Sequence, residues 1–175
     1  AFPVVLAEAD GTEIFSGEFN LETGEIDLNA LASAHPRGEE LARMIEGALA
    51  SDMLASTRQA LAGKKLVIRR GLDNLRLFSI DTHKSPTEIE IDLRLLESVA
   101  DSSGRTYSVE DYYDGIAWAI NHEVAHSIMR TRGRQSIPEE FAIITRDIRN
   151  FLLMDKKSQD ALMWLMSSRN RNDID

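Results

Sequence analysis

The chain has 175 residues, of which 43% are hydrophobic and 28% charged, and this balance is typical of a soluble globular domain with one substantial core. Its formal net charge of −9 argues against general nucleic-acid binding, which requires a concentration of Lys and Arg, and no apolar run approaches the length that spans a bilayer. Because the sequence contains no cysteine, disulfides and thiolate ligands are excluded, and His, Asp and Glu remain as the side chains for a metal site.

The N-terminal part, about residues 1–94, is expected to be rich in strands. Asp10-Gly11 and Thr23-Gly24 are turn signals between apolar segments. A helix is predicted over Gly38–Ala62, where apolar residues recur every three or four positions and Gly63 follows as a terminator. Strands are predicted at Val4–Ala7, Glu13–Phe19, Glu25–Leu28, Lys65–Arg69, Leu75–Ile80 and Glu88–Leu93.

The C-terminal part, about residues 95–175, is predicted to be helical. Helices are expected over Val109 to about Arg132, Pro138 to about Met154, and Ser158 to about Ser168, and a longer loop around Asp101–Tyr107. The sequence shows no internal repeat, low-complexity tract or linker. Residues 1–175 are therefore predicted to form a single α+β domain, with a small antiparallel or mixed sheet followed by helices.

The clearest candidate for a functional motif is His122-Glu123-Val124-Ala125-His126, which fits the pattern H-E-x-x-H. On a helix, residues four apart lie one turn above each other on the same face, so both imidazoles can reach one zinc ion. Glu123 is rotated about 100° from His122 and flanks that ion, where it can take a proton from the activated water and pass it to a leaving amine. The sequence predicts Zn²⁺ ligands at His122 and His126, and a catalytic role for Glu123.

The residues around this motif are typical of a buried helix. Ser108 and Asp111 match a capping box at its start, and Gly133 follows it where a C-terminal glycine is favoured. Two histidines and a glutamate inside such a helix are costly without partners, which favours a metal site over a chance match on ordinary packed histidines. The predicted apolar side holds Ile116, Ala117, Ile120 and Val124, and the histidine side holds Gly115, Trp118, Ala119 and Met129.

A catalytic zinc site usually has three protein ligands and one open position for water. The extended metzincin signature is excluded, because Met129 and Arg132 stand where its glycine and its third histidine would be. The inverted H-x-x-E-H form is also absent. His35 and His83 lie far upstream in loop-like settings, where a plain surface histidine is the ordinary assignment. The third ligand is therefore expected among the acids of the next helix.

That helix opens with Pro138-Glu139-Glu140. At about 100° per residue, Glu140 falls on the edge of its apolar stripe, whereas Glu139 points nearly opposite. A carboxylate on the core side of a helix requires a metal or a cation, so Glu140 is the predicted ligand and Glu139 the fallback. The alternative for Glu140 is a first-turn charge that complements the helix dipole. The stripe itself is predicted to be buried and consists of Ile137, Phe141, Ile144, Ile148 and Phe151.

Asp147 follows Glu140 by seven residues and therefore lies on the same side of the helix. It is a candidate acceptor that orients a ligand histidine. The ordinary alternative is a salt bridge with Arg146 or Arg149 at the edge of the buried face. Five residues are candidates for stabilising an oxyanion by residue type alone, and none is assigned this role: Tyr107, Tyr112, Tyr113, His83 and Arg134.

The segment H-E-V-A-H, followed after a short loop by P-E-E-F-A-I-I-T, resembles compact glutamate-type zinc peptidases (gluzincins). It is similar to the NleD-type effector peptidases that bacteria deliver through type III secretion, and more distantly to clostridial neurotoxin light chains. The likeness covers roughly Glu88 to Phe151, although Ala-Ile-Ile-Thr stands where that family has a more polar continuation. It implies a zincin-like fold and zinc binding by the second glutamate, Glu140. ImmA-like regulatory peptidases, with E-x-x-A on this helix, are a competing likeness that selects Glu139.

The resemblance implies a zinc-dependent endopeptidase with a protein or peptide substrate, secreted or translocated into a host cell; the ImmA-like alternative implies a cytoplasmic regulatory peptidase. No nucleic acid and no membrane is expected as a partner. In related peptidases an edge strand beside the active helix binds the substrate backbone, so Glu88–Leu93 is either that strand or an ordinary sheet strand. Two other classes stay open: a zinc-containing binding or regulatory module without turnover, which does not need Glu123, and a metal-free helical interaction domain.

Overall fold

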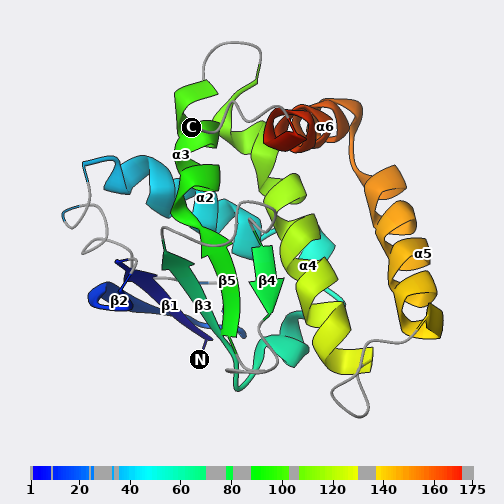
Figure 1. Ribbon diagram of the computed structural model, residues 1–175, viewed down its shortest axis with the longest axis horizontal. Coiled ribbons are helices and arrows are strands. Elements are labelled where there is room, and N and C mark those ends of the chain that lie inside the picture. The colour runs from blue at the N-terminus through cyan, green and yellow to red at the C-terminus, as the bar shows by residue number, and fades with distance from the viewer. Residues whose placement is uncertain are drawn as a thin grey trace.

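Five segments that are rich in β-branched residues or alternate apolar and polar residues form one mixed sheet, in the order β2-β1-β3-β5-β4 (Figure 1). A computed structural model of the chain describes residues 2–8, 10–23, 25, 33, 36–69, 78–80, 88–102, 107–129 and 137–170. Within these residues the predicted α+β class with a small mixed sheet is confirmed. The strands are β1 (Phe2–Ala7), β2 (Glu13–Phe19), β3 (Lys65–Arg69), β4 (Phe78–Ile80) and β5 (Glu88–Asp92).

The three middle strands β1, β3 and β5 run parallel, and β2 and β4 are antiparallel at the two edges. The tight β1–β2 connection depends on Gly11, whose φ of 91° is accessible to glycine at little cost. β5 lies between β3 and β4, so of the two alternatives for Glu88–Leu93 the structure supports the ordinary sheet strand and contradicts the edge strand. The edge strand next to the helices is β4, which contacts the helix that carries the H-E-x-x-H motif.

The core lies between one face of the sheet and the helices packed on it. The strand register places Val4 beside Leu66 and Leu66 beside Ile89, and all three side chains are buried. Helices α2 (Gly38–Leu49) and α4 (Tyr113–Met129) contribute buried side chains to this same cluster. Apolar residues recur every second position in the strands and every three or four positions in the helices, so each element presents one apolar side. These sequence patterns therefore predict the observed packing of a helical layer on a sheet.

In the sequence, Ile89, Ile91 and Leu93 alternate with Glu90 and Asp92, which predicts that the acidic face of β5 lies toward water, and the structure differs from this prediction. Glu90 is 4% exposed and Asp92 is 0% exposed, so both acids are buried. Glu90 accepts a hydrogen bond of 2.5 Å from Arg69, while Asp92 accepts bonds from the backbone N–H and the guanidinium of Arg94. The Asp92 carboxylate also raises the pKa of Arg94. Burial of these acids is possible because each has an arginine partner.

The predicted helix Gly38–Ala62 is shorter than expected. α2 ends at Leu49, and two 3₁₀ turns follow, η1 (Asp52–Leu54) and η2 (Arg58–Leu61). Ser51 adopts an extended conformation, and its hydroxyl accepts the N–H of Met53, which caps η1 and separates it from α2. A side chain that caps a new turn competes with continuation of the helix, although the apolar spacing continues.

The other helices lie close to their predicted positions. η3 (Val109–Tyr112) leads into α4, and the chain continues through α5 (Ile137–Leu153) and α6 (Lys156–Asn170). α3 (Leu93–Ser102), which follows β5 directly, was not among the predicted helices, and it extends into the start of the loop predicted at Asp101–Tyr107. In Figure 1, α4 descends beside the sheet, α5 returns upward on its outer side, and α6 lies across the top. None of the helices within the described residues has both the length and the apolar character of a bilayer crossing. The predicted strand at Glu25–Leu28 lies largely outside the described residues.

Candidate metal centre

The H-E-x-x-H segment lies on α4, a helix held in place from several sides. Its start is fixed by Asp111, whose carboxylate accepts the backbone N–H of Ser108 at 2.9 Å, as the capping pattern predicted. Asn121, next to the motif, donates its side-chain N–H to the carbonyl oxygen of Met53 at 3.0 Å. The four residues predicted for the apolar side of the helix are all buried: Ile116, Ala117, Ile120 and Val124.

His122 makes the most informative contact of this segment. Its Nδ1 lies 2.6 Å from Oδ2 of Asp147, on α5, and the side chains are 29% and 12% exposed. Within the described residues, the Asp147 carboxylate pairs with His122 and with neither Arg146 nor Arg149. The ordinary alternative, a boundary salt bridge to one of these arginines, is therefore wrong. The alternative assignment, an acceptor that orients the histidine, agrees with this contact.

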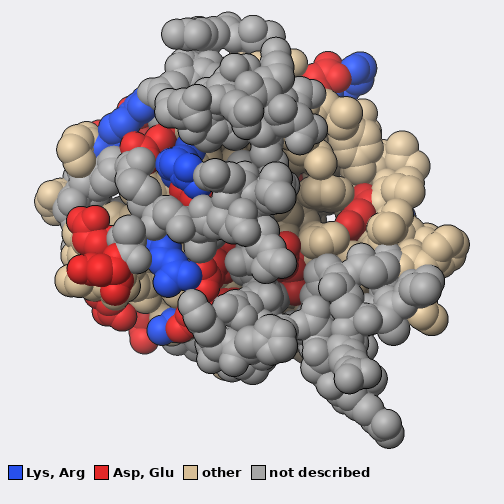
Figure 2. Space-filling view, in the orientation of Figure 1, with Lys and Arg blue, Asp and Glu red and all other residues tan. Residues whose placement is uncertain are grey.

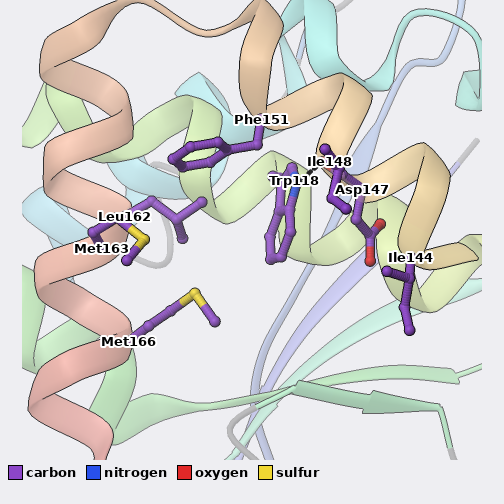
Figure 3. Close-up of a pocket in the computed structure, with 8 residues that line it drawn as sticks. All are labelled: Trp118, Ile144, Asp147, Ile148, Phe151, Leu162, Met163 and Met166. Atoms are coloured by element: carbon purple, nitrogen blue, oxygen red, sulfur yellow. Dashed lines mark hydrogen bonds between the residues drawn. The ribbon is translucent and has the colours of Figure 1, made fainter.

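Trp118 fixes the same arrangement from one turn earlier on α4. Its indole N–H donates to the backbone carbonyl oxygen of Asp147 at 2.9 Å (Figure 3). Its ring stacks on the imidazole of His122, with centroids 6.4 Å apart. The backbone and the side chain of Asp147 are thus each held by a residue of α4. Trp118 was predicted on the histidine side of the helix, but its contact with Asp147 was not; the spacing of four from His122 is the signal that could have indicated it.

The contact with Asp147 has a direct chemical consequence for the imidazole. A carboxylate is an acceptor, so the 2.6 Å contact requires a proton on Nδ1 of His122. In the neutral ring this places the lone pair on Nε2, which is the ring atom that can serve as a metal ligand. Metal-binding histidines commonly donate their other ring N–H to a carboxylate, which fixes the tautomer and the orientation of the ring. The donor chemistry at His122 therefore fits a metal ligand.

The buried face of α5 is not the one that we predicted. Phe141 is 74% exposed, Ile144 51% and Ile148 56%, so the apolar stripe on which the choice of Glu140 depended does not face the core. The side that packs inward instead carries Ile143 and Asp147, which are 0% and 9% exposed. Periodicity identified which residues share a side of this helix, but it did not identify what covers that side.

The position of Asp147 supplies a new basis for comparing the two glutamates. Seven residues correspond to a rotation of about 20°, so Glu140 lies nearly in line with Asp147 along α5, while Glu139 is rotated by about 80°. α4 and α5 run in opposite directions, so both Glu140 and His126 are displaced from the His122–Asp147 contact toward the same end of the helix pair (Figure 1). Ile143, between Glu140 and Asp147, fills the intervening turn with an apolar side chain.

Several predicted residues are described only in part. The backbones of His126, Glu139 and Glu140 are helical, but their side chains lie outside the description. The Glu123 side chain is described and is half-buried. Among the side chains that are described, no three acids or histidines come together as a metal site. His35, His83 and Arg134 also fall outside the described residues.

The tyrosines nominated for the oxyanion are packing residues. Tyr112 is 1% exposed, and its ring makes edge-on contacts with Tyr107 and with Trp164 of α6. Tyr113 lies against α2, where its ring occupies the space that a side chain at Gly47 would need. Burial of the Tyr113 ring also raises the pKa of its hydroxyl. These contacts give all three rings a structural role.

A cavity of about 320 Å³ lies beside the His122–Asp147 pair, between α4, α5 and α6 (Figure 3). Among the described residues that line it, Asp147 contributes the only acidic side chain, and Trp118 lies between α5 and α6. The remaining lining residues are apolar: Ile144, Ile148, Phe151, Leu162, Met163 and Met166.

The chain matches no protein-family model, no curated protein and no solved structure at a significant level. The chemistry of the site therefore rests on the residues and contacts described above.

Proposed function

We propose that this chain is a zinc-dependent endopeptidase that hydrolyses peptide bonds of a protein substrate. The observation that carries the proposal is the hydrogen bond from Nδ1 of His122 to Asp147, on a helix whose sequence is H-E-x-x-H. A histidine that is only packed in a core does not need a buried carboxylate to select its tautomer, whereas a metal ligand gains both orientation and basicity from one. The resemblance to glutamate-type zinc peptidases supports the same assignment.

Each residue of the proposed site has a distinct task. His122 and His126 bind the ion through one ring nitrogen each, and Glu140 is the proposed third ligand, with Glu139 as the fallback. When bound, zinc supplies a Lewis acid that lowers the pKa of water and polarises the scissile carbonyl. Glu123 takes the proton of the attacking water on a carboxylate oxygen and transfers it to the leaving amine. Asp147 holds the imidazole of His122 in place, and Trp118 holds Asp147.

The test is a comparison of the parent chain with Glu123→Gln. We expect about one zinc per chain in both proteins, because Glu123 is not a ligand, and cleavage of a proteome-derived peptide library only by the parent. Metal content is measured by inductively coupled plasma mass spectrometry, and cleavage by mass spectrometry of new peptide termini. Absence of zinc from the parent after loading with zinc alone would overturn the proposal. Zinc without cleavage would instead establish a binding or regulatory module.

A matched pair of variants assigns the third ligand in the same experiment. Glu140→Gln and Glu139→Gln make the same chemical change at neighbouring positions of α5. We expect Glu140→Gln to lose zinc affinity and Glu139→Gln to retain it, because Glu140 is the residue in line with Asp147. The reverse result would assign Glu139 and favour the ImmA-like alternative.

A further inference from the structure

The outer side of α5 and the adjoining part of α6 form an apolar surface. Figure 2 shows it as a mostly tan area over these two helices, whereas red and blue side chains gather over the sheet and α2. Six large apolar side chains, between 43% and 74% exposed, make up this surface, which we name the α5–α6 face: Phe141, Ile144, Ile148, Leu152, Met163 and Met166.

The α5–α6 face is continuous and contains both a ridge and a groove. The ridge is the row of four α5 residues, at spacings of three and four. Ile144 and Ile148 of the ridge also line the 320 Å³ cavity together with Met163 and Met166 of α6, so the groove opens on the same surface. Figure 3 shows the two methionines facing the α5 side chains across this groove.

The area of the face is large for a surface left in water. Side chains of this size present on the order of 150–200 Å² each when fully accessible, so the six residues at their exposed fractions present roughly 600 Å² of apolar area. The largest apolar patch on a typical monomer is roughly 300–600 Å². A standard interface takes roughly 800 Å² from each partner, about two-thirds of it apolar in homodimers. The face thus supplies the apolar area that one side of a homodimer needs.

We propose that the α5–α6 face is the interface with a second copy of this chain. A ridge and a groove on one surface are self-complementary under two-fold symmetry, because the ridge of each copy can enter the groove of the other. The six exposed side chains are uncharged, and Asp147, the acid that lines the groove, already pairs with His122, so these residues favour an apolar partner surface over a charged one. The two-fold axis then passes between the ridge and the groove, close to Ile144 and Ile148, which border both, with the two copies of α5 antiparallel.

Sedimentation velocity over a concentration series from about 1 to 100 μM tests the proposal, with Ile148→Glu as the disrupting variant. Ile14→Glu is the matched control, because Ile14 is an exposed isoleucine on β2, away from the face. We expect the parent and the control to dimerise and Ile148→Glu to be monomeric, with at least a tenfold loss of dimer affinity. A parent that is monomeric throughout would overturn the proposal. So would a dimer that Ile148→Glu leaves intact.

A second measurement tests the symmetry without disturbing the interface. Because the chain has no cysteine, Ile148→Cys and Ile14→Cys each introduce a single thiol. Mild oxidation should link Ile148→Cys into a covalent dimer several times faster than Ile14→Cys, since only the former places two thiols near the axis. Equal rates for the two variants would exclude the proposed axis.

Discussion

Replacement of Asp147 by alanine should weaken zinc binding without unfolding the protein. The lost contact joins a carboxylate that is 12% exposed to Nδ1 of His122 at 2.6 Å. Hydrogen bonds to charged groups contribute about 1.5–3 kcal/mol, and loss of such an outer partner costs roughly 10–100-fold in metal affinity, which is about 1.4–2.7 kcal/mol. We therefore expect a 10–100-fold rise in the dissociation constant for zinc, measured by competition with a chromophoric chelator. Asp147→Asn, which retains an acceptor oxygen, should give an intermediate value.

The matched control is Asp160→Ala, an acid on α6 that pairs with Lys156 at the surface. This variant should keep the affinity of the parent within about twofold, since a surface ion pair contributes little. Long-range ¹H–¹⁵N spectra of the zinc-free proteins supply a second readout: His122 should carry its proton on Nδ1 in the parent and populate both tautomers in Asp147→Ala. If zinc affinity and tautomer are unchanged in Asp147→Ala, the proposed role of Asp147 is refuted.

Two predictions concern stability. Gly47→Ala should destabilise the protein by about 0–2 kcal/mol, because a Cβ there collides with the ring of Tyr113 and overpacking outweighs the gain in helix propensity; in a Tyr113→Ala background the same change should stabilise it by about 0.5–1 kcal/mol. Urea unfolding of the parent, Gly47→Ala, Tyr113→Ala and the double variant measures both changes in the free energy of unfolding. If Gly47→Ala changes that free energy with the same sign in both backgrounds, the close packing of α2 on α4 is contradicted. Asp155→Ala should lower the urea midpoint at pH 7, because the Asp155 carboxylate accepts the N–H of Ser158 and caps α6. The pKa of Asp155 is lowered from 3.8 chiefly by that backbone hydrogen bond, so the stabilisation is present above pH 3.8 and is lost as the pH falls through the folded pKa. A difference between the two midpoints that stays constant from pH 7 to pH 3 would contradict this account.

Local signals predicted several elements of this fold, although they missed α3 and extended α2 beyond Leu49. β2 and β3 have the bounds that alternation and the flanking glycines indicated. The start of α4 was set by a capping pattern that depends on Ser108 and Asp111 alone. Such features succeed because their physical cause lies within a few residues of the chain.

The two errors in predicted burial have a different cause. The acidic side of β5 was expected in water and is buried, because Arg69 and Arg94 supply partners. The apolar side of α5 was expected in the core and is exposed, because nothing within the described residues packs on it. A repeating pattern fixes which side chains share a face, but burial depends on what the rest of the chain places against that face.

The candidate site likewise combines features that the sequence predicts with features that depend on tertiary packing. The spacing of His122 and His126 on one helix face follows from the sequence, and so does the side of α5 that carries Asp147. That Asp147 pairs with His122 rather than with an arginine depends on how α5 packs against α4, which only the structure supplies. Helix spacing also placed Trp118 on the correct side of α4. Its hydrogen bond to the Asp147 carbonyl was not predicted, because that bond depends on how α5 packs against α4.

The stacking of Trp118 on His122 has a practical consequence for spectroscopy. The chain contains two tryptophans, and the other, Trp164, lies against Tyr112 instead of beside the candidate site. An indole whose ring faces an imidazole changes its emission when that imidazole gains a proton or a metal. Replacing Trp164 with phenylalanine would leave one fluorophore, directly on the histidine of interest. Emission of Trp118 should therefore report on His122, so zinc binding at the proposed site could be followed in real time without a label.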